Sequence, residues 1–220
     1  MQFRKEFKNS YEVIYRDTNE NEISILCDSY GSDKGSTESK THAYSDFYSD
    51  FFSSQKLSIK SVFECGIGSI NPSIPFNMGI NGRPGASLRV WRDYFPMAHI
   101  YGADIDESIL FTEDRITTAY VDQTDSDSID SMWNEFNIDS VDVIIDDGLH
   151  QAVAAITLFE SSIDRLRKGG LYVIEDLDHE NLNTLRLHFK GSKHEFRYIR
   201  FENYEFGPKG GFLAFLTKNY

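Results

Sequence analysis

Two acidic segments hold the side chains that are best placed to do chemistry. Asp146 and Asp147 are adjacent, and Glu175 and Asp176 form a second adjacent pair further along the chain. Carboxylates that crowd together without a counter-charge raise each other's pKa, whereas several carboxylate oxygens around one point suit a hard divalent cation such as Mg²⁺. The alternative is a set of helix caps and solvated loop acids, which explains one acid per segment more easily than two. We therefore favour a metal ion at these acids.

His150 follows Asp147 by three positions and is the candidate general base. A histidine near a cation and an open cleft can accept a proton near neutral pH, because its ordinary pKa is close to neutrality. Without the neighbouring acids, a single histidine is more often a polar surface residue. If His150 is not the base, His42 and Tyr48 of the N-terminal segment are the next candidates.

A folded scaffold must bring the two acidic pairs together. Five short apolar runs predict the strands of such a scaffold. These runs are typical of strands that are buried on both faces. Helical patterns alternate with them, which indicates a parallel sheet with right-handed crossovers. The two acidic pairs would then follow the fourth and fifth strands, at the edge where open α/β sheets bind ligands. The runs are Ser61–Cys65, His99–Ala103, Thr118–Val121, Val141–Ile145 and Leu171–Ile174.

Apolar residues at helical spacing lie between these runs and before them. Near the C-terminus, Glu195–Phe201 and Gly211–Thr217 are joined by a short, turn-rich connection and predict an antiparallel pair at one sheet edge. The predicted fold is therefore a Rossmann-like sheet with helices on both faces. The helical patterns cover Tyr44–Phe52, Leu88–Phe95, Ile129–Phe136 and Ala152–Leu166, the last ended by Gly169–Gly170.

The segments after the first two strands could bind a nucleoside. Glycines in Glu64–Ser69 would let the backbone approach a ligand and expose amide groups, although a GxG pattern alone also fits a plain turn. After the second strand, a carboxylate could accept hydrogen bonds from ribose hydroxyls or cap the next helix. Asp104 and Asp106 are equal candidates for these two roles.

Asp122 follows the third predicted strand. Its carboxylate could accept a hydrogen bond from an adenine amine. The alternative is a cap for the next helix, and that position suits Thr124 or Asp125 better. Asp122 is therefore kept as a candidate ligand contact.

Composition excludes several classes of protein. The 220 residues fit one domain, and 40% hydrophobic residues exclude wholesale disorder. A net charge of −13 argues against broad nucleic-acid binding and against an anionic membrane surface. No apolar run is long enough to span a membrane, and the N-terminus does not resemble a signal peptide. Two cysteines are too few for a disulfide scaffold, so we expect a cytoplasmic location.

Taken together, these segments resemble class I S-adenosylmethionine-dependent methyltransferases. Within that class the chain is most similar to the metal-dependent macrocin and mycinamicin sugar O-methyltransferases, from about Gly31 to Lys218. The matching segments are Ser32–Gly35 with His42, Tyr44 and Tyr48; Gly85–Pro96; Ile100–Asp106; Asp122–Asp125; Ile144–His150; and Gly169–Asp176.

The resemblance implies a seven-stranded sheet whose last strand is antiparallel. It implies Mg²⁺ held by Asp147, Glu175 and Asp176, with His150 as the base that deprotonates the acceptor hydroxyl and Asp147 as a second catalytic residue. It also implies homo-oligomers, with residues 1–57 closing the active site of a core that spans 58–220. The implied contacts to S-adenosylmethionine or S-adenosylhomocysteine are Lys34, Glu64, Gly66, Gly68, Ser87, Asp104, Asp122 and Asp146.

We therefore predict an O-methyltransferase that acts on a sugar hydroxyl of a small molecule. The alternatives are an N-methyltransferase and a donor-binding module that has lost catalysis; a metal-dependent hydroxylase is disfavoured because no two-histidine, one-carboxylate iron site is evident. Two features depart from the family. Leu149 stands where serine is common, and the insert Ser69–Arg83 is longer than a usual glycine loop. Both bear on the acceptor.

Overall fold

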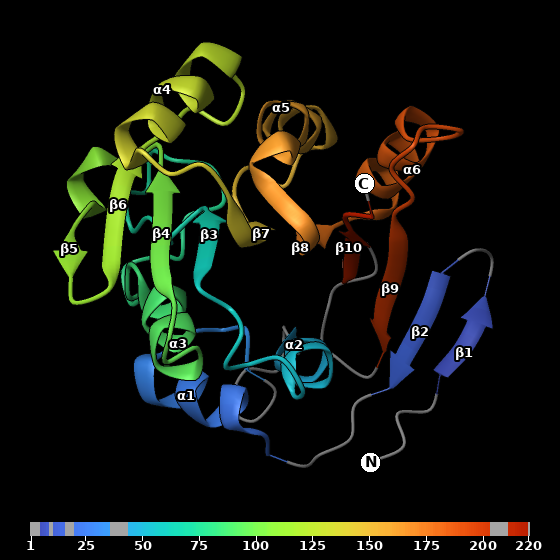
Figure 1. Cartoon of the computed structure of the whole chain (residues 1–220), viewed down its shortest axis with the longest axis horizontal. Helices are drawn as coiled ribbons and strands as arrows, with labels where there is room; N and C mark the ends of the chain where they lie inside the picture. Colours follow the sequence, from blue (N-terminus) through green and yellow to red (C-terminus); the bar gives the residue numbers. More distant parts are fainter. Residues whose placement is uncertain (1–4, 9–10, 16–19, 36–43, 203–210, 220) are drawn as a thin grey trace.

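A ten-stranded sheet runs through the computed structural model, which describes residues 5–8, 11–15, 20–35, 44–202 and 211–219. The strand order across the sheet is β1-β2-β9-β10-β8-β7-β3-β4-β6-β5 (Figure 1). The strands are β1 (Lys5–Lys8), β2 (Tyr11–Tyr15), β3 (Ser61–Cys65), β4 (His99–Asp104), β5 (Thr112–Glu113), β6 (Ile116–Tyr120), β7 (Val141–Asp146), β8 (Leu166–Leu177), β9 (Arg197–Glu202) and β10 (Phe212–Thr217).

Seven of these strands are the predicted ones, and their arrangement confirms the predicted fold class. Strands β6, β4, β3, β7 and β8 are parallel neighbours, and β10 is antiparallel to both β8 and β9. The predicted count of seven is too low for the whole sheet, because β2 adds to β9, β1 adds to β2, and β5 pairs with β6. Strand β5 has two residues, too few to produce a periodic pattern.

Helices cover both faces of the sheet, as predicted. Helices α4, α5 and α6 lie over one face and α1, α2 and α3 over the other (Figure 1). Among the described residues, no helix is long and apolar enough to cross a membrane. The helices are α1 (Glu22–Tyr30), α2 (Tyr44–Phe52), α3 (Ala86–Tyr94), α4 (Ser126–Phe136), α5 (Ala152–Ser162) and α6 (His179–His188), with 3₁₀ turns η1 (Glu107–Ile109) and η2 (Ile163–Arg165).

The predicted end of α5 is wrong. The apolar stripe runs on to Leu166, but the helix ends at Ser162 and Leu166 already pairs with Val141 as the first residue of β8. The register shifts before pairing resumes further along β8, and Gly169, at φ +78°, lies in this irregular stretch. Here the glycine marks a bulge-like irregularity in a strand rather than a helix C-cap.

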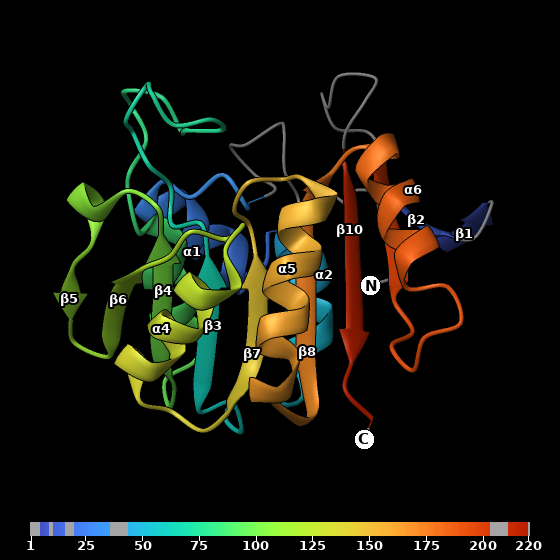
Figure 2. The same ribbon diagram turned by 90° about the horizontal axis from the view of Figure 1, so that it is seen from above.

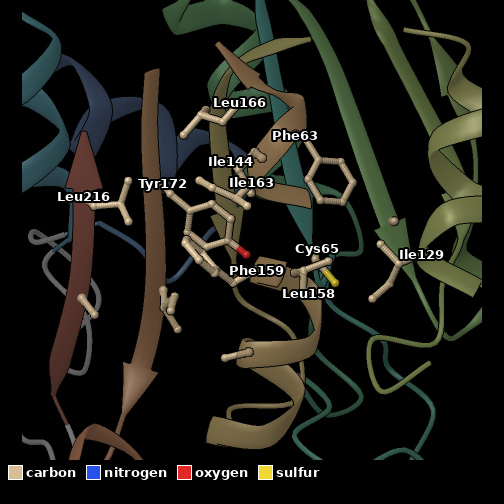
Figure 3. Packing of buried hydrophobic residues seen from close by; sticks show 14 of the residues in the cluster. Phe63, Cys65, Ile129, Ile144, Leu158, Phe159, Ile163, Leu166, Tyr172 and Leu216 are labelled. Atoms are coloured by element: carbon tan, nitrogen blue, oxygen red, sulfur yellow. The ribbon is translucent and has the colours of Figure 1, made fainter. Parts of the chain in front are cut away.

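The apolar face of α5 packs on the sheet and makes one half of the core (Figure 3). The ring of Phe159 meets the ring of Tyr172 edge-on, with centroids 5.0 Å apart. On the opposite face, Tyr48 of α2 packs edge-on against Trp91 of α3 at 4.9 Å, and Phe47 packs against Phe215 of β10 at 5.0 Å. These contacts hold α2 beneath the sheet, where its tyrosine hydroxyls reach acids at the end of β8.

Candidate active site

A cavity of about 1000 Å³ opens at the carboxyl ends of the parallel strands. Its lining includes Gly66, Asp104, Asp122, Asp147 and Asp176, which follow or end β3, β4, β6, β7 and β8. Since neighbouring strands lie about 4.8 Å apart, the four spacings from β6 to β8 give the rim a width of roughly 19 Å. This volume is at the upper end of the range for small-molecule sites, so the cavity can hold two ligands side by side.

The glycine loop after β3 forms the floor of one half of this cavity. Gly66 has φ +86° and Gly68 has φ +91°, a region that favours glycine. A Cβ at Gly66 would collide with the backbone carbonyl of Asp147. Asp104 fixes the loop, because its carboxylate accepts hydrogen bonds from the backbone N–H of Ile67 at 2.9 Å and of Asp106 at 3.0 Å. Burial raises the pKa of Asp104.

The structure separates helix caps from cavity residues among the other rim acids. Asp106 caps η1 by accepting from the backbone N–H of Ser108, and Asp125 caps α4. Asp122 lines the cavity, and one of its carboxylate oxygens accepts from the backbone N–H of Thr124 at 2.9 Å. The predicted donor contacts that line the cavity are Lys34, Gly66, Gly68, Ser87, Asp104 and Asp122.

Two other predicted donor contacts, Glu64 and Asp146, lie behind the cavity wall. Asp146 is buried, and one of its oxygens accepts from Gln123 Nε2 at 2.6 Å. Its other oxygen has no hydrogen-bond partner in the described part of the chain. Burial raises the pKa of Asp146 to about 6. Gln123 also accepts from the backbone N–H of Leu149 at 2.8 Å, so it braces the base-bearing loop. Sequence reasoning missed this residue, although it sits between two rim acids.

Lys34 lies among three acidic side chains. It is 3% exposed, and its Nζ lies 2.5 Å from Asp147 Oδ2 and 3.4 Å from Glu64 Oε1 and forms an ion pair with Glu175. Burial lowers the pKa of Lys34, but the carboxylates outweigh burial and raise it well above its usual value. Burial raises the pKa of Glu64 to about 7. One ammonium cannot neutralise three carboxylates, so Glu64 is a natural place for a bound proton.

Two tyrosines of α2 hold the acids at the end of β8. The Tyr48 hydroxyl donates to Glu175 Oε1 at 2.5 Å, and the Tyr44 hydroxyl donates to Asp176 Oδ1. The two tyrosines are four positions apart, so they share one face of the helix. Tyr44 lies in a helical pattern and in a family motif of the sequence, neither of which singles it out as a site residue. The i, i+4 spacing of two tyrosines was the signal that could have singled it out.

The acids that face the cavity fit a hard divalent cation. Ligand atoms of Asp147, His150 and Asp176 all lie within 4.8 Å of one another. Two carboxylates with room for water are the donors that Mg²⁺ prefers. Glu175, the third predicted ligand, is fully buried, and its two oxygens are already bonded to Tyr48 and Lys34. It does not line the cavity, so the structure groups Asp147 and Asp176, but not Glu175, with His150.

His150 faces Asp176 in a strained loop. Its Nε2 lies 3.9 Å from Asp176 Oδ2, and its buried Nδ1 has no hydrogen-bond partner among the described residues. His150 has φ +53° and Asp176 has φ +54°. Left-handed backbone at a residue other than glycine costs about 1–3 kcal/mol, and such strain clusters at functional sites. The loop therefore presents an available imidazole beside two carboxylates.

The chain matches curated bacterial sugar O-methyltransferases over part of its length. It is 40% identical over 93 residues to the 8-demethyl-8-alpha-L-rhamnosyl tetracenomycin-C 2'-O-methyltransferase of Streptomyces olivaceus, which is 42% of this chain and 24% of that protein. It is equally identical over 93 residues to the mycinamicin VI 2''-O-methyltransferase of Micromonospora griseorubida, 42% of this chain and 23% of that protein. The chain thus spans about a quarter of the length of these relatives.

Solved structures support the same resemblance. The structure superposes on the MycE methyltransferase of the mycinamycin pathway, solved with Mg, SAH and mycinamycin VI, with a TM-score of 0.58 and 31% identity over 72% of this chain and 40% of that one. A putative caffeoyl-CoA O-methyltransferase from Staphylococcus aureus, at TM-score 0.56 and 10% identity, covers 90% of this chain and 93% of its own and shares the fold. No protein-family model matches the chain. The expected resemblance to these methyltransferases is confirmed.

Proposed function

We propose that the chain is a Mg²⁺-dependent O-methyltransferase that transfers the methyl group of S-adenosylmethionine to a sugar hydroxyl of a small molecule. The observation that carries this proposal is the meeting of Asp147, His150 and Asp176 within 4.8 Å at the rim of the cavity that the glycine loop also lines. The named activities of the relatives support the choice of O-methylation and of a sugar.

The donor would lie over the ends of β3, β4 and β6. Gly66 and Gly68 permit close approach of the backbone, and Asp104 and Asp122, which line the same cavity, would contact the ribose and the adenine. Asp147 and Asp176 would hold the Mg²⁺, with Glu175, which is buried and bonded to Lys34 and Tyr48, as the proposed third ligand. When bound, the cation would lower the pKa of the acceptor hydroxyl.

His150 would accept the proton of the acceptor hydroxyl. An imidazole nitrogen accepts a proton only when it is unprotonated, so His150 acts as the base in its neutral form. The new bond joins the acceptor oxygen to the methyl carbon, and the bond from that carbon to sulfur breaks. The protein would also have to align the acceptor oxygen, the methyl carbon and the sulfur.

Three further properties are proposals of the same kind. Residues 20–35 and 44–52 would close the site, because Lys34, Tyr44 and Tyr48 reach its acids; His42 lies outside the described residues. A cytoplasmic location is supported by the two free, buried cysteines, Cys27 and Cys65. Self-association is supported only by the family resemblance.

The proposal is tested by calorimetry and by a methyl-transfer assay. S-adenosylhomocysteine should bind the protein, and Asp104→Ala should weaken that binding by about 1.5–3 kcal/mol through loss of charge-assisted hydrogen bonds. A panel of glycosides should then be screened for methylation with Mg²⁺. Absence of donor binding, or methylation of amines in preference to hydroxyls, would overturn the proposal.

A further inference from the structure

The insert that follows the glycine loop carries an aromatic ring to the candidate base. Phe76 lies in the insert Ser69–Arg83, yet its ring centroid is 5.1 Å from that of His150, and the two ring planes are 79° apart. Phe76 lines the cavity and is nevertheless 60% exposed. Figure 2 shows the insert, in teal, standing beyond the ends of the strands, and several of its residues line the cavity. A large apolar side chain thus stands uncovered beside the reacting groups.

The backbone holds this ring in place at a conformational cost. Phe76 has φ +57°, a value that is rare for a bulky residue. Hydrogen bonds on both sides support the turn: the Asn77 side chain donates to the Ile74 carbonyl at 2.7 Å, and the Met78 N–H donates to the Ser69 carbonyl at 2.8 Å. An exposed ring contributes little to the stability of the fold, so core packing does not explain the left-handed backbone at Phe76. Strain of this kind points to function.

The position of the ring assigns it to one half of the cavity. His150 and Asp176 belong to the ends of β7 and β8, whereas the glycine loop, Asp104 and Asp122 belong to β3, β4 and β6. The side chain of Met78 stands over Gly68, because a Cβ at Gly68 would collide with its sulfur. Met78 therefore borders the donor half, and Phe76 borders the half that a second ligand would occupy.

We propose that Phe76 is the platform on which the sugar ring of the acceptor stacks, and that it selects which glycoside is methylated. A pyranose presents an apolar C–H face and a polar rim. Its face would cover the exposed Phe76 ring, and its rim would direct hydroxyls toward His150 and toward Asp178 and Asn181, which line the same half. This inference rests on the proposed function, because it needs a sugar in that half.

The test compares Phe76→Ala and Phe76→Trp with Ile80→Ala. Ile80 is the matched control, since it lies in the same insert, is 90% exposed and does not line the cavity. Binding of methyl α-L-rhamnopyranoside in the presence of S-adenosylhomocysteine is followed by saturation-transfer NMR, and S-adenosylhomocysteine affinity by calorimetry. The acceptor KM and kcat are measured with a glycoside that the wild-type protein methylates.

Phe76→Ala should raise the rhamnoside Kd and the acceptor KM about 10- to 100-fold, the loss expected when one apolar contact of this size is removed. In Phe76→Ala, donor affinity and kcat should change less than about twofold. Phe76→Trp keeps an aromatic ring and should therefore bind the rhamnoside about as well as wild type. An unchanged Kd, an equal loss of donor affinity, or a fall in kcat alone would overturn the inference. Phe76-dependent rhamnoside binding without turnover by the wild type would instead count against the proposed function and leave the platform standing.

Discussion

The ammonium of Lys34 lies 2.5 Å from a carboxylate oxygen of Asp147, although 113 positions separate the two residues in the chain. The same nitrogen pairs with Glu175, so one N-terminal side chain joins the acids at the ends of β7 and β8. Lys34 and Glu175 are buried, and Tyr48 of α2 donates to Glu175, whereas Asp147 faces the cavity. Among the described residues, Lys34 and helix α2 therefore contribute side chains to the candidate site.

Lys34→Met should reduce the free energy of unfolding by about 3–5 kcal/mol, because removal of one partner leaves buried charges uncompensated. Urea denaturation measures this loss. Adding Glu175→Gln to Lys34→Met should recover part of it, since one of the unpaired carboxylates disappears. Lys56→Met is the control: its ion pair with Glu22 is partly exposed, and its loss should cost less than about 1 kcal/mol. Strict additivity in the double variant would contradict the buried pairing.

Asp147→Asn and Asp176→Asn should each weaken Mn²⁺ binding at least tenfold, the scale on which changes at a metal site act. Manganese is the probe because its binding can be followed by electron paramagnetic resonance without turnover. Chelation should abolish methyl transfer, and Mg²⁺ or Mn²⁺ should restore it. Asp178→Asn changes a cavity acid outside the cluster and should leave Mn²⁺ affinity unaltered. Full activity in excess chelator would show that these acids do not serve a metal.

His150→Asn should lower turnover by roughly 10²–10⁴-fold, the usual contribution of general acid–base catalysis. Asparagine is the chosen replacement because His150 has φ +53°, and asparagine tolerates left-handed backbone better than alanine does. Affinity for S-adenosylhomocysteine should stay within a few-fold of wild type, and Mn²⁺ titration checks the metal site. Turnover within a few-fold of wild type would assign the deprotonation to another group, with His42 and Tyr48 the first to be replaced.

Asp146→Asn should change how stability depends on pH. The folded pKa of Asp146 is raised to about 6, so between about pH 4 and pH 6 the folded protein binds more protons than the unfolded chain and this group makes stability fall as pH rises. The asparagine variant lacks that contribution. Its free energy of unfolding, relative to wild type, should therefore rise across this window by up to about 3 kcal/mol.

Gln123→Ala is the control for this measurement, because it removes the hydrogen bond that Gln123 donates to Asp146 and keeps the titratable carboxyl group. It should lower stability throughout while its difference from wild type stays nearly constant from pH 4 to pH 6. If the stability difference between Asp146→Asn and wild type is also constant from pH 4 to pH 6, the raised pKa of the Asp146 carboxyl is contradicted.

The seven main strands and the rim positions follow from the sequence because their signals are local. Buried parallel strands such as Ser61–Cys65 appear as short apolar runs, and the residues that end them reach a common edge by topology alone. Local patterns also identified Asp147, His150 and Asp176 as neighbours. The added strands β1, β2 and β5 and the end of α5 did not follow, since strand pairing across the sheet decided them.

The division of labour among the acids was decided only by the tertiary structure. Glu175 and Asp176 are adjacent and chemically alike, but the register of β8 against β10 shifts between Ile174 and Leu177, and Asp176 has φ +54°, so this irregularity sets where each side chain points. One is therefore buried against Lys34 and Tyr48, and the other faces the cavity. The sequence determined which residue types reach the rim. Which carboxylate meets a lysine and which meets a ligand depends on contacts between segments more than a hundred positions apart, and no local pattern encodes those contacts.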